Sequence, residues 1–178
     1  MAAGASAPAI PGYHVVEQRR PQGSHGGLAT YYRQSLQLES TQGNEYGLCT
    51  KLILPTSQRI NIVNIYVPPT SSLTRRGITE AQATAQVELV LERLQPQHTT
   101  LLCGDFNARI GTRAPLLNND HPPRIVTDTH ICPRANWFIK MCEMNNVYII
   151  NGIHSLAAYT CHTGRGESTV DYMLCNKQ

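Results

Sequence analysis

An aspartate and an asparagine two residues apart form the sharpest chemical signal in the sequence. The apolar run 101–103 leads through Gly104 to Asp105, and Asn107 follows after one further residue. A carboxylate can accept a proton or bind a hard cation, and a neighbouring amide can donate to a developing oxyanion. In extended backbone, two-residue spacing would put both side chains on the same side of a strand. The alternative is an Asx turn in which the aspartate only closes the strand.

Two further polar residues lie in runs that otherwise suggest buried strands. Tyr66 lies near the end of the run 60–67, before two prolines, and its phenol could orient or protonate a phosphate oxygen. Asp171 interrupts an apolar run, where a buried carboxylate is unfavourable unless it is paired or hydrogen-bonded. It could orient a catalytic histidine or a substrate group. The alternatives are a half-buried strand aromatic for Tyr66 and a structural ion pair with an arginine for Asp171.

Arginines flank or lie within the polar, proline-rich segment 108–133. The guanidinium group offers a rigid fork of donors that suits phosphate oxygens. Together these side chains could grip a phosphate backbone, and Arg109 and Arg113 are the candidate substrate contacts. The alternative is a solvated loop that happens to be rich in arginine. The four arginines are Arg109, Arg113, Arg124 and Arg134.

Periodicity and turn signals predict the elements that must position these residues. The run 60–67 is β-branched and nearly continuous, which predicts a strand covered on both faces. The segment 79–95 changes to helical spacing, begins with a capping box at Thr79 and Gln82, and ends before Pro96. The other predicted strands are 13–18, 27–33, 48–54, 99–105, 147–151 and 168–175; a second helix is predicted over 134–145, and a long surface loop over 108–133. This irregular alternation favours a mixed α/β layered fold.

Composition narrows the class of protein. A chain of 178 residues suits one domain, predicted here over 12–178 after a flexible leader at 1–11. No run approaches 18 apolar residues, so no membrane span is expected. The six cysteines form no CxxC pair, which argues against a zinc finger and favours buried thiols of an intracellular protein. The leader lacks the basic start of a signal peptide, so we expect the nucleus or cytoplasm and no secretion.

Four motifs, taken in order, resemble the endonuclease/exonuclease/phosphatase superfamily. They are GGLATYYR at 26–33, NIYVPP at 64–69, CGDFNARIG at 103–111 and STVDYML at 168–174. The segment 134–153, RANWFIKMCEMNNVYIINGI, is similar to the corresponding segment of non-LTR retrotransposon endonuclease domains. The resemblance covers residues 12–177.

This resemblance implies a fold, a reaction and roles for four residues. The fold would be a four-layer α/β sandwich, in which two mixed β-sheets pack face to face between helices. The reaction would be phosphodiester hydrolysis, with DNA as the partner and Mg²⁺ or Mn²⁺ as cofactor. By resemblance, Asp105 would activate water and, with Asn107, bind the metal. Asn107 would also stabilise the transition state, Tyr66 would contact the scissile phosphate and Asp171 would orient a histidine.

Four residues of the family pattern have no counterpart in the sequence. The family's first asparagine and its metal-binding glutamate would fall where the leader 1–11 stands, and this segment contains no Asn, Asp or Glu. Its Ser-Asp-His motif would follow the strand at 168–175. We therefore expect a domain incomplete at its N- and C-terminal strands, with weak Mg²⁺ binding. Three hypotheses follow: a DNA endonuclease, a weak or inactive remnant with at most nucleic-acid binding, and a domain completed by another polypeptide.

Overall fold

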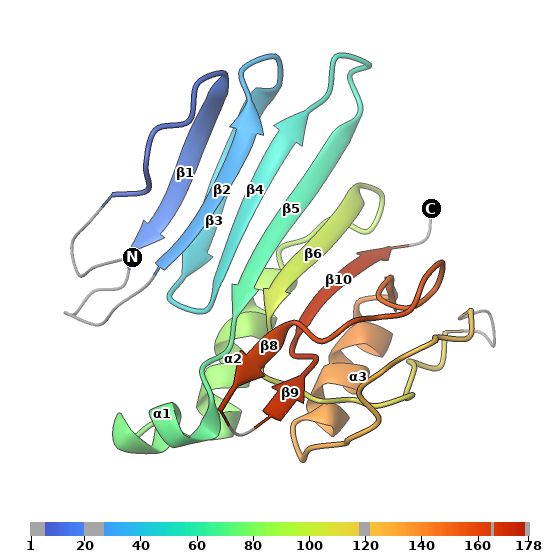
Figure 1. The fold of residues 1–178 in the computed structure, drawn as a ribbon. Coiled ribbons are helices and arrows are strands. Elements are labelled where there is room, and N and C mark those ends of the chain that lie inside the picture. Colours follow the sequence, from blue (N-terminus) through green and yellow to red (C-terminus); the bar gives the residue numbers. More distant parts are fainter. Residues whose placement is uncertain (1–5, 20–26, 118–121, 165, 177–178) are drawn as a thin grey trace.

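The computed structural model describes residues 6–19, 27–117, 122–164 and 166–176, which form a mixed α/β fold (Figure 1). The elements, in chain order, are β1 (Tyr13–Arg19), β2 (Gly27–Arg33), β3 (Gln37–Asn44), β4 (Gly47–Ile53), β5 (Arg59–Tyr66), α1 (Thr70–Arg75), α2 (Glu80–Leu91), β6 (Thr99–Asp105), α3 (Ala135–Met144), β7 (Val147–Ile149), β8 (Cys161–Thr163), β9 (Gly166–Ser168) and β10 (Asp171–Asn176).

A six-stranded mixed sheet forms the centre of the molecule. Its strand order is β3-β4-β5-β6-β10-β7, and β5 and β6 are its parallel pair. β10 returns antiparallel to β6. The C-terminal ends of β5 and β6 and the N-terminal end of β10 therefore meet at one edge, the lower end of the sheet in Figure 1.

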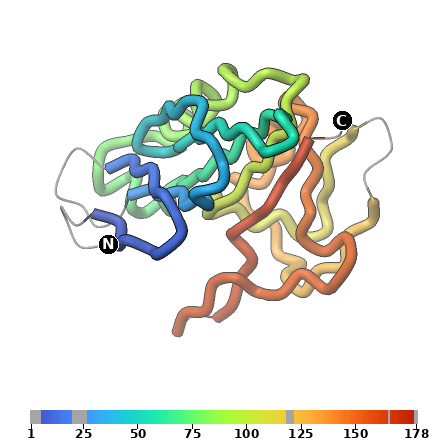
Figure 2. Tube along the Cα trace, turned by 90° about the horizontal axis from the view of Figure 1, so that it is seen from above, coloured from blue at the N-terminus to red at the C-terminus, as the bar shows by residue number. Residues whose placement is uncertain are grey.

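Helices cover one face of this sheet, and a two-stranded ribbon packs on part of the other. Val63 and Ile65 of β5 join side chains of α2 and α3 in one buried core. On the opposite face, Asn64 Nδ2 donates to the carbonyl of Ala29 in the antiparallel β1–β2 ribbon. The prediction that strand 60–67 is covered on both faces is thus confirmed. In Figure 2, the ribbon lies at the blue N-terminal side, and the β8–β9 hairpin projects from the body.

The start of α2 is fixed by the capping box that the sequence predicts. The Thr79 hydroxyl accepts from the Gln82 backbone N–H at 3.1 Å, and the Gln82 side chain accepts from the Thr79 N–H at 2.8 Å. These two bonds satisfy N–H groups that a free helix end would leave unpaired. The helix ends at Leu91 rather than near residue 95. The capping box therefore fixes the residue at which α2 begins.

Several predicted boundaries were wrong, and three elements were not predicted. The predicted strand 168–175 corresponds to β10, which begins only at Asp171; Ser168 is instead the last residue of β9, and two residues separate the two strands. β3 was missed because its polar residues show no strand alternation, and α1 and β8 were missed because both are short. The segment 108–133 is a loop but not merely a surface one, since its described residues include buried Ile110 and Leu117. Of the leader, residues 6–11 are described, and Ala7 N–H donates to Glu17.

Candidate active site

Three of the predicted site residues occupy adjacent register positions on three neighbouring strands. Asp105, the last residue of β6, pairs with Tyr66 of parallel β5 and with Asp171 of antiparallel β10. Side chains at such positions point to the same face of a sheet and lie about 5 Å apart at Cβ. This is the face on which Asn64 contacts the β1–β2 ribbon, opposite the helices. The topology thus brings together residues up to 105 positions apart in sequence.

Gly104 allows the strand before Asp105 to approach β5 closely. Its φ of +144° lies in a region that side chains rarely adopt, and a Cβ there would lie 1.9 Å from the Ile65 carbonyl oxygen. Only glycine fits this position without moving one of the two strands. The Gly-Asp pair of the sequence motif therefore has a steric cause: glycine lets β6 reach the register that places Asp105 beside Tyr66.

Asn107 holds the Asp105 carboxylate through two hydrogen bonds. The Asn107 backbone N–H donates to Oδ1 at 2.8 Å, and its side-chain Nδ2 donates to Oδ2 at 2.9 Å. Nδ2 also donates to the Val67 carbonyl at 2.9 Å. Asn107 has φ +46°, so a turn, and not the strand pleat expected from the spacing, brings the two side chains together. The Asx-turn alternative is therefore what the local geometry shows.

This turn leaves the carboxylate with capacity for a further ligand. Each carboxylate oxygen can accept about two hydrogen bonds or ligands, and Asn107 occupies one on each oxygen. The pKa of Asp105 is raised to about 6, chiefly by burial and also by the negative charge of Asp171, while the hydrogen bonds from Asn107 oppose this rise. Asp105 is therefore poised to exchange a proton near neutral pH.

The donor set at this edge suits a divalent cation held by few protein ligands. Two carboxylates, Asp105 and Asp171, face each other in register, so their repulsion would be relieved by a cation. Asn107 Oδ1 receives no hydrogen bond from the described residues. Mg²⁺ is commonly bound through one or two carboxylates, with water and phosphate oxygens completing its shell. Within the described ranges, however, no three His, Cys, Asp or Glu side chains cluster closely enough to hold a metal alone.

Asp171 is held in place through its backbone. Its N–H and that of Val170 both donate to the Thr160 hydroxyl at 3.1 Å, and Asn151 Nδ2 donates to the Asp171 carbonyl at 3.2 Å. None of the ion pairs found among the described residues includes Asp171. Thr160 and Asn151 were not identified from the sequence, because only the folded chain brings them to β10.

The candidate substrate contact Arg109 is engaged inside the protein. Its Nε and Nη2 bond both oxygens of buried Asp128, at 2.8 and 2.6 Å. Burial alone would raise the pKa of Asp128, but hydrogen bonds from Arg109 and from the backbone N–H groups of Thr169 and His130 hold it below its usual value. The pair ties the loop after Asp105 to the residues that precede β10. Arg113 bonds the Asn136 side chain at 2.6 Å and is not joined to the four catalytic candidates by any described hydrogen bond.

Arg134 and Arg124 bind protein acceptors and not a phosphate backbone. Buried Arg134 donates to both oxygens of Glu80, at 2.7 and 2.8 Å, and to the carbonyls of Pro68, Phe106 and Asn107. It therefore connects the ends of β5 and β6 to the start of α2. Arg124 donates to three loop carbonyls, and burial lowers its pKa. The expectation that Arg134 grips a phosphate backbone was wrong, because all its donors bind protein acceptors, and Arg124 directs Nε and Nη1 to the protein backbone.

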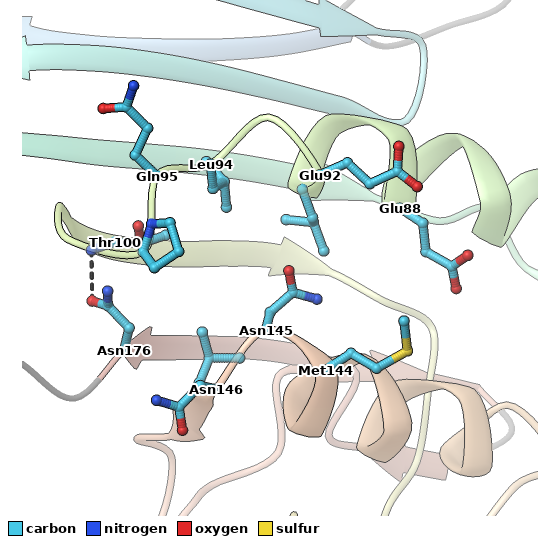
Figure 3. Close-up of a pocket in the computed structure, with 12 residues that line it drawn as sticks. Glu88, Glu92, Leu94, Gln95, Thr100, Met144, Asn145, Asn146 and Asn176 are labelled. Atoms are coloured by element: carbon cyan, nitrogen blue, oxygen red, sulfur yellow. Dashed lines mark hydrogen bonds between the residues drawn. The ribbon is translucent and has the colours of Figure 1, made fainter.

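A cavity of about 370 Å³ lies at the opposite end of β6, between the C-terminal ends of α2 and α3 (Figure 3). Its wall includes Thr100, whose backbone N–H donates to Asn176 Oδ1 at 2.7 Å. Thr100 and Asp105 are five positions apart, about 17 Å along a strand. This cavity is therefore separate from the candidate active site.

Among the described residues, no helix combines the length and the apolar character that crossing a membrane requires. The six cysteines are all free thiols.

Comparisons with known proteins agree with the architecture. The APE2 catalytic domain of Xenopus laevis superposes with a TM-score of 0.62 at 14% identity, covering 95% of this chain and 68% of that one. An AP endonuclease from Archaeoglobus fulgidus gives 0.59 at 16% identity, covering 93% and 67%. ANGEL2, a 2′,3′-cyclic phosphatase in complex with adenosine-2′,3′-vanadate, gives 0.54 at 16% identity, covering 93% and 63%. At these identities the likeness establishes the fold.

The chain thus spans about two thirds of the length of these solved structures. A search of curated proteins finds no significant match. Among protein families, the Endonuclease/Exonuclease/phosphatase family matches residues 2–178, nearly the whole chain. This protein is therefore a member of the endonuclease/exonuclease/phosphatase family.

Proposed function

We propose that this chain hydrolyses phosphodiester bonds in DNA at the sheet edge formed by Tyr66, Asp105 and Asp171. The observation that carries the proposal is their adjacent register on β5, β6 and β10, with Asn107 bonded to both oxygens of Asp105. Family membership and the endonuclease and phosphatase relatives support a phosphodiester-hydrolysing role.

Each residue has a role that follows from its contacts. Asp105 accepts the proton of the attacking water, because burial has raised its pKa to about 6 while hydrogen bonds still favour the carboxylate. Asn107 positions Asp105; both of its side-chain N–H groups are used, so we assign it no donation to the transition state. Tyr66, next to Asp105 in register, orients the scissile phosphate through its hydroxyl group.

Asp105, Asp171 and Asn107 Oδ1 would hold a divalent cation, Mg²⁺ or Mn²⁺. When bound, the cation would neutralise charge on the phosphate oxygens. Asp171 serves here as a second carboxylate, and among the described residues no hydrogen bond joins it to a histidine. Arg109 and Arg113 remain candidate substrate contacts; Arg109 would first have to leave Asp128.

A second candidate is a domain of this family with little or no catalytic activity. The absence of a three-residue metal-binding cluster among the described residues favours it, since two carboxylates bind Mg²⁺ weakly. Nucleic-acid binding would then be the remaining function.

The retroelement type is a finer part of the proposal. Its support is the segment 134–153, which forms α3 and β7 and resembles retrotransposon endonucleases in sequence. A reverse-transcriptase reading frame beside the gene would support this origin, and its absence from every genomic copy would count against it.

Completion by another polypeptide is also proposed, on the basis of the uncovered sheet face. The β1–β2 ribbon packs on β3, β4 and β5 but leaves β6, β10 and β7 without a described strand layer. Met173 of β10 is 44% exposed on this face. A further pair of strands would cover it.

Nicking of supercoiled plasmid DNA tests the proposed function. Purified protein with Mg²⁺ or Mn²⁺ should convert supercoiled to open-circular plasmid, and EDTA should stop the conversion. Asp105→Ala should lose the activity, whereas Glu92→Ala, which removes an exposed carboxylate at the opposite end of the molecule, should retain it. Folded wild-type protein that never nicks DNA would instead favour the inactive alternative.

A further inference from the structure

A second cavity lies on the helix side of the sheet edge that carries the candidate active site, and it shares Asn107 with that site. Its volume is about 590 Å³, and it lies between the N-terminal ends of α2 and α3, with Asn107 in its wall. Pockets of this size are typical of small-molecule and cofactor sites. Because Asn107 also bonds the Asp105 carboxylate, the cavity and the proposed reaction centre share a residue.

The charged groups in the cavity wall neutralise each other. Arg134 is buried and gives its donors to Glu80 and to three backbone carbonyls. The Glu80 carboxylate accepts from Arg134 and also from the Thr70 hydroxyl. No cation in the wall is therefore left to attract a phosphate, and the occupant that this charge pattern favours is a neutral group.

The rest of the wall is mostly apolar and includes one aromatic residue, although Thr70, Thr84 and Asn107 also line it. Ala81 and Pro133 line the cavity, and Trp137 is partly buried against the core. The Trp137 indole is held in place, because Nε1 donates to Glu88 at 3.0 Å. A fixed aromatic side chain in an apolar cavity suits a flat heteroaromatic ring, since bases stack on aromatic side chains irrespective of sequence.

We propose that this cavity binds a nucleobase of the nucleic acid whose phosphate lies at Asp105. The inference rests on the proposed function and adds to it a base-binding subsite lined by Trp137, Ala81 and Asn107. Binding there would position the strand without reading its sequence. It would also exclude substrates that carry a phosphodiester but no base.

The single tryptophan of the chain gives a direct measurement of binding. Titration with adenosine 5′-monophosphate should quench Trp137 fluorescence in a saturable manner. Ribose 5-phosphate, which carries the same phosphate without a base, should leave the emission unchanged. Equal responses to the two ligands, or no response to either, would overturn the proposal.

Two alanines on the same helix provide a matched pair of variants. Ala81 and Ala85 are both exposed residues of α2, but only Ala81 lines the cavity. Ala81→Leu should fill the cavity and weaken nucleotide binding at least tenfold, whereas Ala85→Leu should bind like the wild type. Circular dichroism should show both variants folded. Unchanged binding in a folded Ala81→Leu variant would also refute the subsite.

The binding measurement is independent of catalysis. Quenching by the nucleotide without plasmid nicking would retain the subsite and reject the proposed hydrolysis. Nicking without quenching would retain the hydrolysis and reject the subsite. If both hold, Ala81→Leu should raise KM for DNA about tenfold and leave kcat nearly unchanged, because Ala81 contacts no reacting group.

Discussion

At the residue scale, Asp105 and Asp171 are like charges in unequal surroundings. Asp105 receives two hydrogen bonds on its carboxylate from Asn107, whereas the bonds around Asp171 hold its backbone N–H and carbonyl. Burial and the charge of Asp171 raise the pKa of Asp105, and Asn107 opposes both. Two neighbouring groups thus adjust the protonation of one carboxylate.

We predict that Asn107 supports hydrolysis through its side-chain amide and not through its backbone conformation. Asn107→Gly keeps the φ of +46° accessible but removes the side-chain bond to Asp105. We expect hydrolysis to fall roughly 10- to 100-fold, as for other groups that orient a reacting ligand. The measurement is the rate of plasmid nicking by the folded variant at pH 7.5. A variant with the wild-type rate would show that the amide is dispensable.

At the element scale, close contact between β5 and β6 sets the position of the site. Gly104→Ala would place a Cβ 1.9 Å from the Ile65 carbonyl oxygen, so one strand must move. We expect a loss of about 3 kcal/mol in the free energy of unfolding, measured by urea denaturation, together with loss of nicking. Gly164→Ala, where no atom lies within 4 Å of the added Cβ, is the control and should change stability by less than about 0.5 kcal/mol. If Gly104→Ala and Gly164→Ala have the same free energy of unfolding, position 104 does not require glycine.

Arg134 links three elements through one side chain. Lysine at this position keeps the charge but has no planar fork, so several acceptors at Glu80 and the β5 and β6 ends would lose their donors. Arg134→Lys should lower the free energy of unfolding by about 3 kcal/mol, which corresponds to a decrease in Tm of about 6–12 °C in a thermal melt. The control is Arg75→Lys on the exposed side of α1. If Arg134→Lys and Arg75→Lys have the same Tm, the contacts of Arg134 contribute little to stability.

What the sequence could predict depends on how local each signal is. The capping box of Thr79 and Gln82 and the strand that ends at Asp105 rest on neighbouring residues, and both were predicted correctly. The partner of Arg134 lies 54 residues away and that of Arg109 lies 19 away, so arginine content alone suggested phosphate binding. The edge strand β3 is polar and exposed, and its pairing with β4 defines it. The four candidate residues were identified as polar residues in or beside apolar runs, and the resemblance to a family supplied their roles; their adjacency required the sheet order.

At the scale of the whole molecule, one face of the central sheet is covered more completely than the other. Helices bury one face, while the other carries the β1–β2 ribbon over β3–β5 only. Beyond the ribbon, Met173 is exposed and Leu101 and Cys103 are partly exposed. An apolar face beside unpaired strand edges favours association with another chain.

Self-association is therefore expected, and it should depend on this face. Met173→Glu should increase the monomer fraction in sedimentation velocity experiments, because a charge would oppose burial of the face. Leu89→Glu changes a similarly exposed apolar residue, 46% exposed on α2, and should not alter association. A wild-type chain that remains monomeric at high concentration would show that this face does not drive self-association.

The most direct test of the central claim is the pH dependence of hydrolysis. The carboxylate form of Asp105 is the active one, so the rate should rise with pH as this group loses its proton; a bound cation lowers the pKa of a carboxylate ligand, so at saturating Mn²⁺ the midpoint should lie below the pKa of about 6 that Asp105 has without a cation. Asp171→Asn removes the neighbouring negative charge, which lowers the pKa of Asp105 and should move the midpoint to lower pH when both proteins are saturated with Mn²⁺. Asp105→Asn should abolish hydrolysis at every pH, because the amide cannot accept the proton. A midpoint that is the same in wild type and Asp171→Asn, or activity that survives in Asp105→Asn, would contradict the assignment of Asp105 as the proton acceptor.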